Sequence, residues 1–252
     1  MGKLSKHANL EELHKIDLAM LKLIDEICEK EQISYFMQAG TLLGAVRDGG
    51  FIPWDDDADI MMYREEFDRF EQCAPPYLKQ AGFYLNYTDR VPKICLKEEP
   101  DARVDIFIID YLPDHPLKKK YKLFMLKLLQ GMAKSDVDLS AYSLKGRLLV
   151  GVTGTLGKLF SEKKLLEFYK KMSVYGSSEA SRKCFWSNDL YRFIHYEFDR
   201  DYWRETERMP FEDAMLSAPK NWDMYLKINY GDSYLMPAKE NYYVSVPQVN
   251  LK

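Results

Sequence analysis

Long hydrophobic runs are missing from this 252-residue sequence. A helix that crosses a bilayer needs about 20 predominantly apolar residues, and no stretch of the chain approaches that length. The opening residues MGKLSK also lack the apolar centre of a signal peptide. We therefore expect a cytoplasmic protein whose contact with the inner membrane surface, if it has one, is peripheral.

The sequence also has no closely spaced pair of cysteines and no large net charge of either sign. The cysteines Cys28, Cys73, Cys95 and Cys184 contain no C-x-x-C pair, so their spacing indicates neither a zinc ribbon nor a disulfide framework. The formal net charge is only -3, which argues against a general nucleic-acid-binding protein. A content of 46% hydrophobic residues is enough to bury a full core in one large domain.

The segment from Tyr35 to Met62 combines a Gly-Thr turn with a cluster of aspartates. Its apolar and aromatic start, Ile33 to Met37, predicts a buried strand that ends at the small residues before Thr41. Gly40 lets backbone approach a ligand. Thr41 precedes a short helix predicted over Leu42 to Arg47, where its hydroxyl and N–H could hold an anion.

Carboxylates alternate in the second half of this segment. Asp57 to Met62 predicts a strand, and alternation places Asp55, Asp57 and Asp59 on one face if the strand extends back that far. Same-face neighbours lie about 6 to 7 Å apart, so two carboxylates could share one divalent cation or a pair of cations. Mg²⁺ prefers such hard oxygen ligands. The alternative is a solvated Asp-rich loop, but the direct passage into apolar residues favours a site.

A third carboxylate lies in the run from Arg103 to Ile109, which predicts a central strand. Asp105 is near its start, and burying a charge there is costly unless the charge is paired or bound to metal. A neighbouring strand could therefore aim Asp105 at the same metal. The alternative is an aspartate in water at the end of a strand.

Two basic residues are candidates for phosphate contacts. Lys93 falls just before a strand predicted over Ile94 to Leu96, where it could meet a phosphate or simply be solvated. Arg47 ends the short helix near the acidic run. It could pair with a carboxylate, hold a substrate phosphate, or form a salt bridge that stiffens the loop.

The other elements are predicted from periodicity and breakers. A helix from Asn9 to before Ser34 carries an apolar stripe at helical spacing: Leu13, Ile16, Met20, Leu23, Ile24 and Ile27. A helix from Arg64 to Cys73 is expected to stop at Pro75-Pro76. We expect a strand at Phe83 to Tyr87, a helix at Ser161 to Lys171, and a glycine-rich flexible or packed connection at Gly146 to Phe160.

A helix predicted from Leu117 to Lys134 contains basic residues and no acidic ones. Its lysines are Lys118, Lys119, Lys120, Lys122, Lys127 and Lys134. Such a basic amphipathic helix could lie on an anionic membrane or hold a polyanionic acceptor. A solvated basic face over a buried apolar face explains the same residues.

The motifs GTLLGAVR and GFIPWDDDADI, within Gly40 to Asp59, resemble the LicD family. This family includes bacterial phosphocholine transferases and is related to the fukutin-type ribitol-phosphate transferases. The VDIF motif at Asp105 also matches, as do C-terminal residues, namely Phe211-Glu212, Pro219, Tyr225-Leu226, Tyr230-Gly231-Asp232 and Pro237. The resemblance covers the chain from the first helix to Pro237, with a poorly matched middle.

The resemblance implies an α+β, nucleotidyltransferase-like fold, with a mixed β-sheet core flanked by helices. Its turn, its Asp-x-Asp strand and its third aspartate map onto Gly40-Thr41, Asp57 with Asp59, and Asp105. We expect one catalytic domain over residues 1–252. Its core spans about 8–112, a helical basic insertion about 115–175, and an aromatic-rich C-terminal part about 184–252.

The resemblance also implies a reaction. Phosphocholine, or a similar polyol phosphate, would pass from a CDP-linked donor to the hydroxyl of a teichoic-acid or lipopolysaccharide glycan, releasing CMP. Asp57 and Asp59 would hold Mg²⁺, or Mn²⁺ in its place, with Asp105 as a further ligand or as the base. The alternatives are a nucleotidyltransferase acting at the α-phosphate and a non-catalytic nucleotide-binding protein with the same fold.

Overall fold

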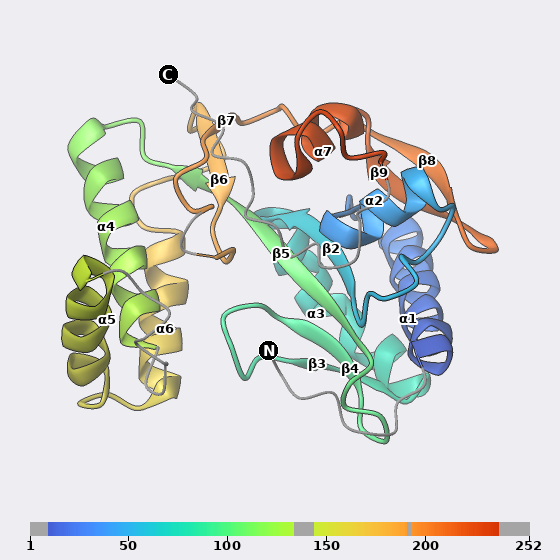
Figure 1. Ribbon diagram of the computed structural model, residues 1–252, viewed down its shortest axis with the longest axis horizontal. Helices are drawn as coiled ribbons and strands as arrows, with labels where there is room; N and C mark the ends of the chain where they lie inside the picture. The colour runs from blue at the N-terminus through green and yellow to red at the C-terminus, as the bar shows by residue number, and fades with distance from the viewer. Residues whose placement is uncertain (1–9, 134–143, 191–192, 237–252) are drawn as a thin grey trace. The chain divides into compact units, whose positions relative to one another are not determined.

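The computed structural model describes residues 10–133, 144–190 and 193–236 (Figure 1). Asn9, Lys134 and Pro237, which the sequence analysis singles out, lie outside these ranges. The chain divides into two compact units. Unit 1 contains Met1–Asn86, Lys93–Ile106 and Asp201–Lys252, and unit 2 contains Tyr87–Pro92 and Phe107–Arg200. The single catalytic domain over residues 1–252 stays a prediction.

A β-sheet forms the centre of unit 1. Its strands follow the order β1-β2-β5-β4-β3 and are β1 (Phe36–Met37), β2 (Ala58–Tyr63), β3 (Phe83–Asn86), β4 (Lys93–Leu96) and the start of β5 (Arg103–Leu112). The pairs β1–β2, β3–β4 and β4–β5 are antiparallel. Apolar residues of β2 and β5, such as Ile60 and Val104, are fully buried. A charged side chain at the start of either strand therefore lies at the edge of an apolar interior.

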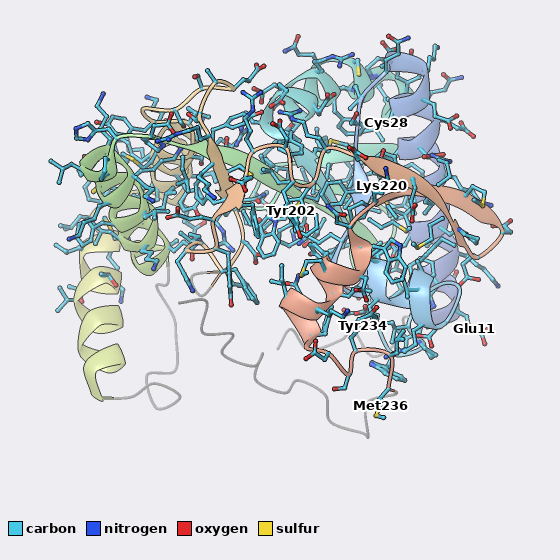
Figure 2. All side chains as sticks on the ribbon, turned by 90° about the horizontal axis from the view of Figure 1, so that it is seen from above. Glu11, Cys28, Tyr202, Lys220, Tyr234 and Met236 are labelled. Atoms are coloured by element: carbon cyan, nitrogen blue, oxygen red, sulfur yellow. The ribbon has the colours of Figure 1, made fainter. Side chains whose placement is uncertain are left out.

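Helices and a hairpin complete unit 1. They are α1 (Leu10–Glu31), α2 (Ala39–Arg47), α3 (Arg64–Gln80), α7 (Trp222–Tyr230) and the β8–β9 hairpin (Thr206–Phe211 and Ala214–Pro219). Helix α1 packs on α3 and β9, whereas α2 packs on β2, β8 and α7. Tyr234 follows α7 (Figure 2). Its hydroxyl donates a 2.7 Å hydrogen bond to Asp223.

The predicted apolar stripe of α1 is confirmed at Leu13, Met20, Ile24 and Ile27, which are all buried. Ile16 and Leu23 are only half-buried. Asp17 and Leu21 take their place on the buried side. The helix therefore carries a carboxylate on the face that it packs against the rest of unit 1.

The start of α2 differs from the prediction. Strand β1 ends at Met37, and the helix begins at Ala39 rather than at Leu42. The N–H of Leu42 donates to the Gln38 carbonyl at 3.1 Å, which closes a helical turn at this point. Gly40 and Thr41 therefore lie in the first turn of the helix and not in a turn that ends a strand.

The predicted end of α3 at Cys73 is wrong, because the helix continues through Pro75 and Pro76 to Gln80. Both prolines face solvent. Ala74 and Leu78, on the opposite side, are fully buried. Burial of these apolar side chains holds the helix against the core and offsets the backbone hydrogen bonds that the prolines cannot make.

Unit 2 pairs the end of β5 with β6 (Lys183–Trp186), and β6 with β7 (Phe198–Asp199), both antiparallel. Its helices are α4 (Pro116–Met132), α5 (Leu144–Gly157) and α6 (Glu162–Ser173). Helices α4 and α6 share a hydrophobic core with β5 and β6, made of Leu112, Leu126, Leu129, Leu165, Tyr169, Phe185 and Ile194. None of the helices in the described ranges has both the length and the hydrophobicity that a bilayer crossing requires.

The connection predicted over Gly146 to Phe160 is wrong for most of its length, because α5 occupies it. Glycine at two positions lets α5 approach α4 closely. A Cβ on Gly157 would collide with the Met132 carbonyl oxygen, and one on Gly131 would lie 2.7 Å from the Thr153 hydroxyl oxygen. The glycines therefore serve helix packing, which periodicity alone does not reveal.

Candidate functional site

Three carboxylates converge at the start of the two central strands of unit 1. Asp57 precedes β2, Asp59 lies within it, and Asp105 is the third residue of β5. Each offers one oxygen, and these oxygens lie within 4.8 Å of one another. Because Asp59 and Asp105 meet although each is near the beginning of its strand, β2 and β5 run in parallel, which makes the sheet mixed.

Helix α2 fixes the backbone of β2 at this point. The Asp59 N–H donates to Thr41 Oγ1 at 2.8 Å, and the Gln38 N–H donates to the Asp59 carbonyl at 3.0 Å. Thr41 is buried, with 3% of its surface exposed. Its hydroxyl oxygen therefore positions an acidic strand, and anion binding by Thr41 stays a prediction.

Asp55 does not lie on the acidic strand, because β2 begins only at Ala58. The Asp55 N–H donates to the Ile52 carbonyl at 3.0 Å in a turn, and the Asp55 carbonyl lies 2.8 Å from His14 Nε2. Its carboxylate packs against Gly40, where a Cβ would collide with Oδ2. The structure thus explains the glycine at 40 by contact with Asp55, and substrate contacts of both residues stay predictions.

The β8–β9 hairpin and α7 brace the segment that leads to the aspartates. Glu212 Oε1 accepts a 3.0 Å hydrogen bond from the Phe51 N–H, and the Glu212 N–H donates to the Gly49 carbonyl at 2.8 Å. The Tyr225 hydroxyl accepts one from the Ala39 N–H at 3.3 Å. Two of the C-terminal residues in the LicD resemblance, Glu212 and Tyr225, therefore hold the two ends of this segment.

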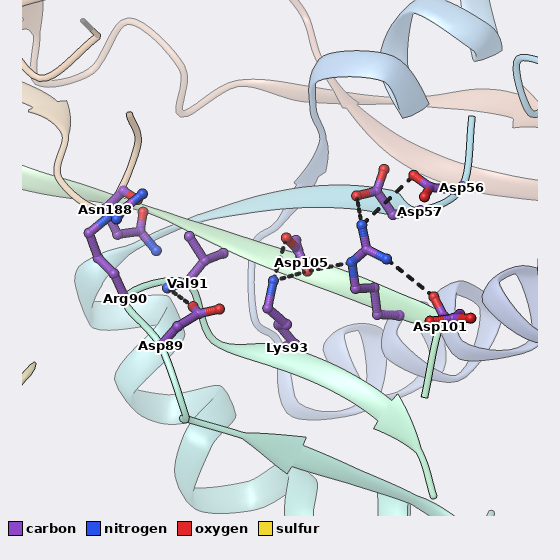
Figure 3. A network of polar contacts seen from close by, with 10 residues as sticks. Asp56, Asp57, Asp89, Arg90, Val91, Lys93, Asp101, Asp105 and Asn188 are labelled. Carbon is purple, nitrogen blue, oxygen red and sulfur yellow. Dashed lines mark hydrogen bonds and ion pairs between the residues drawn. The ribbon is translucent and has the colours of Figure 1, made fainter. Parts of the chain in front are cut away.

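Two cations lie among the carboxylates (Figure 3). The β4–β5 register places Lys93 opposite Asp105, and Lys93 Nζ lies 2.9 and 2.8 Å from its two oxygens. Arg103 Nη2 lies 2.6 Å from Asp57 Oδ2 and 3.8 Å from Asp56 Oδ1. The structure thus brings Lys93 to the site, where it is paired with Asp105.

Arg103 is a site residue that the sequence analysis missed. The signal was available, because alternation along a strand puts Arg103 on the same face as Asp105, as it does for Asp57 and Asp59. The sequence does not reveal that Arg103 pairs with Asp57, because the two residues are 46 positions apart.

Asp17 of α1 was also missed. It is fully buried, and its carboxylate oxygens make no hydrogen bond of good geometry to the described residues. Burial, followed by the charge of Asp57, raises the pKa of Asp17 from 3.8 to about 8, which the nearby backbone N–H and guanidinium of Arg103 only partly offset. The sequence pattern that indicates its burial is the i, i+4 spacing of Leu13, Asp17 and Leu21 along the apolar stripe of α1.

Negative charge is in excess at this site. Six carboxylates surround two cations: Asp17, Asp55, Asp56, Asp57, Asp59 and Asp105 with Lys93 and Arg103. Burial raises the pKa of Asp57, although the charge of Arg103 lowers it in part. Burial likewise raises the pKa of Asp105, although the charge of Lys93 lowers it in part. Burial, then Asp57, raises the pKa of Asp55 to about 7. Close hard oxygens with unbalanced charge are what a divalent cation such as Mg²⁺ requires.

Arg47 is oriented toward another partner. Its Nη2 lies 2.7 Å from Asp48 Oδ2, and its guanidinium lies over the Trp54 ring at 5.7 Å from the centroid. Among the described residues, its carboxylate partner is thus the adjacent aspartate and not the acidic run. A contact between Arg47 and substrate stays a prediction.

Known proteins are similar to the segment that contains these residues. The profile of the family described as LicD/FKTN/FKRP, nucleotidyltransferase domain, matches residues 32–130. This segment contains α2, β2 and the start of β5, and with them every site residue proposed from the sequence. The fold is therefore that of a nucleotidyltransferase-like α+β domain. Over this segment, the chain is similar to the LicD family.

Relatives are similar over part of their length. Lipopolysaccharide cholinephosphotransferase LicD of Haemophilus influenzae is 34% identical over 143 residues, which are 48% of this chain and 54% of that protein. Human ribitol 5-phosphate transferase FKRP is 41% identical over 61 residues, 23% of this chain and 12% of that protein. The chain thus spans about half the length of the first relative and a smaller share of the second.

A solved structure, that of the antibiotic-resistance factor ANT(2'')-Ia, aligns with 62% of this chain and 93% of its own chain. The sequence identity is 12% and the TM-score is 0.29. This likeness is too weak to support any conclusion about the chain.

Proposed function

We propose that this protein transfers phosphocholine, or a similar polyol phosphate, from a CDP-linked donor to a glycan hydroxyl. The observation that carries the proposal is the convergence of Asp57, Asp59 and Asp105 beside two cations. Support also comes from the 34% identity to a protein named lipopolysaccharide cholinephosphotransferase. The acceptor oxygen would attack the phosphorus next to the choline, and the bond from that phosphorus to CMP would break.

We propose that Asp57 and Asp59 bind Mg²⁺, for which Mn²⁺ could substitute, with Asp105 as a further ligand or as the base. When bound, the cation supplies neutralisation of the diphosphate of the donor. As the base, Asp105 would take the proton of the acceptor hydroxyl, and the burial that raises its pKa suits this role. Lys93 and Arg103 would bind phosphate oxygens once their carboxylate partners, Asp105 and Asp57, turn to the metal.

The test is CMP release by the purified chain with Mg²⁺ and a panel of CDP-linked donors, each with and without candidate glycans. Asp59→Asn removes a metal-binding charge at nearly constant shape, so we expect a loss of turnover of roughly a hundredfold or more. Asp213→Asn is the matched control, because that carboxylate is exposed in the β8–β9 turn and pairs with Lys22. Full activity of Asp59→Asn would refute the assignment.

Nucleotidyl transfer is the second candidate, because the matching family is itself described as a nucleotidyltransferase domain. The acceptor oxygen would then attack the α-phosphorus, and the bond from that phosphorus to the bridging oxygen would break. The acceptor would carry the nucleotide, and pyrophosphate or another phosphate group would leave. The products separate the two reactions, since only the first gives free CMP and a phosphocholine-bearing acceptor. Donor binding without turnover on any glycan would instead favour a non-catalytic nucleotide-binding protein.

A further inference from the structure

Helix α4 has two apolar faces, and the described residues of unit 2 cover only one of them. Leu126 and Leu129 are buried in the core of this unit. On the other side, Leu117, Tyr121 and Phe124 are 73%, 48% and 63% exposed. Their spacing of i, i+4 and i+7 places them in one stripe along the helix. Packing within unit 2 needs only the first face, so the exposed stripe requires another explanation.

Aromatic and aliphatic side chains after α6 extend this stripe. The rings of Tyr121 and Tyr175 meet edge to face with centroids 5.5 Å apart. Val174 and Tyr175 are themselves 46% and 39% exposed. The apolar surface is therefore a patch built from two segments of unit 2 and not a single side chain in water.

The charge of α4 is of one sign, with five lysines and no acidic residue. Lys122 is directed inward, where its Nζ donates to the Tyr111 carbonyl at 2.6 Å and to Ser177 Oγ at 2.9 Å. Lys119 pairs with Glu197 at 2.9 Å. Lys118 and Lys120 are exposed and flank the stripe. Positive charge thus borders the exposed apolar surface.

We propose that this docking face, defined as Leu117, Tyr121 and Phe124 with Lys118 and Lys120, binds the surface of a membrane that contains anionic phospholipids. A helix with an apolar stripe between lysines can lie in the interfacial plane, with its apolar side chains among the acyl chains and its ammonium groups at the phosphates. Charge complementarity also argues against a second copy of this chain as the occupant. Two apposed α4 helices would bring their lysines together and repel one another.

The docking face lies in unit 2 and shares no residue with the carboxylate cluster, so its test does not depend on the reaction. The purified full chain is mixed with vesicles of phosphatidylcholine alone, or with roughly one-third phosphatidylglycerol, and bound protein is measured by flotation. We expect binding to the anionic vesicles, little binding to the neutral ones, and release as salt screens the lysines.

Two pairs of variants localise the binding. Leu117→Gln with Phe124→Gln should lower the partition coefficient roughly tenfold or more, whereas Met215→Gln with Met224→Gln, at exposed positions in unit 1, should not. Lys118→Glu with Lys120→Glu should lower it by a similar factor. Lys79→Glu with Lys97→Glu changes the net charge equally at exposed positions elsewhere and should have the smaller effect.

Several results would overturn the proposal. These are absence of binding to anionic vesicles, equal loss in the control pair and the α4 pair, or a dimer in light scattering that Leu117→Gln with Phe124→Gln dissociates. Thermal unfolding and circular dichroism of each variant confirm that it is folded. If the protein binds vesicles but releases no CMP, only the proposed function is contradicted. If the protein releases CMP but does not bind vesicles, only the membrane inference is contradicted.

Discussion

Arg103 separates carboxylates that would otherwise repel one another. Its side chain lies 2.6 Å from Asp57 and 3.8 Å from both Asp56 and Asp105. In metal-free protein, Arg103→Gln should lower the free energy of unfolding by about 2 kcal/mol, because it leaves Asp57 half-buried without its partner. Mg²⁺ should recover part of the loss. Urea unfolding with and without the metal measures both effects.

Arg182→Gln is the control for this prediction. Its ion pair with Asp114 is largely exposed and screened by solvent, so its loss should leave the free energy of unfolding nearly unchanged. If both variants lost the same stability, or if Mg²⁺ restored neither, the view of Arg103 as a counter-ion that a metal can replace would be wrong.

Asp17 should make the stability of the metal-free protein depend on pH. Its pKa is about 8 in the folded protein against 3.8 as the ordinary value, so the folded state holds the proton more tightly. This contribution is complete below about pH 4 and is lost as pH rises to about 8. Asp17→Asn cannot ionise and should be more stable than the parent at pH 8, with little difference at pH 4.

Urea unfolding in EDTA between these two pH values tests the effect. Asp213→Asn serves as the control, because Asp213 is exposed and Lys22 holds its pKa below the ordinary value. It should leave the decline from pH 4 to pH 8 in place. A decline that persists in Asp17→Asn would assign the pH dependence to another group, such as Asp55.

At the scale of elements, α2 packs closely against the loop before β2, where Gly40 contacts the carboxylate of Asp55. Gly40→Ala should lower the free energy of unfolding by roughly 1 to 3 kcal/mol, because the added methyl group collides with Asp55 Oδ2. Asp55→Ala removes that oxygen and should cancel much of the cost in the double variant. A double-mutant cycle of unfolding free energies measures this coupling.

Gly151→Ala is the matched control in α5. A Cβ there meets nothing within 4 Å, so the helix preference for alanine should make the change neutral or stabilising by up to about 1 kcal/mol. Additive losses in the Gly40 and Asp55 variants would show that the two residues do not interlock.

Local patterns predicted much of the site at this scale. Alternating aspartates at the start of β2 and the apolar run of β5 indicated Asp57, Asp59 and Asp105. Side chains alternate between the two faces of a strand, so the sequence alone shows which of them share a face. The start of α2, the passage of α3 through Pro75-Pro76 and the helical state of α5 depend on tertiary packing, which single-segment patterns do not contain. The partnerships of Arg103 and Asp17 join distant segments and were missed for the same reason.

At the scale of the whole molecule, the carboxylate cluster lies in unit 1 and the proposed membrane face lies in unit 2. Mg²⁺ should therefore protect backbone amides of α2, β2 and the first residues of β5 from hydrogen exchange, because a bound cation neutralises the repulsion between the aspartates and stabilises the folded state that binds it. Amides of α4 and α6 should exchange as before. Asp59→Asn should abolish the protection, whereas Asp213→Asn should retain it.

Hydrogen exchange with vesicles in place of Mg²⁺ should give the reverse pattern. Amides at the start of α4 should slow when anionic vesicles are added, and those of β2 should not change, if the two surfaces work independently. Protection of both units by either addition would mean that metal and membrane binding are coupled. In that case, anionic vesicles should raise the apparent affinity for Mg²⁺ by the same factor as Mg²⁺ raises the affinity for vesicles. A Mg²⁺ titration with and without vesicles, and a vesicle titration with and without Mg²⁺, measure the two factors.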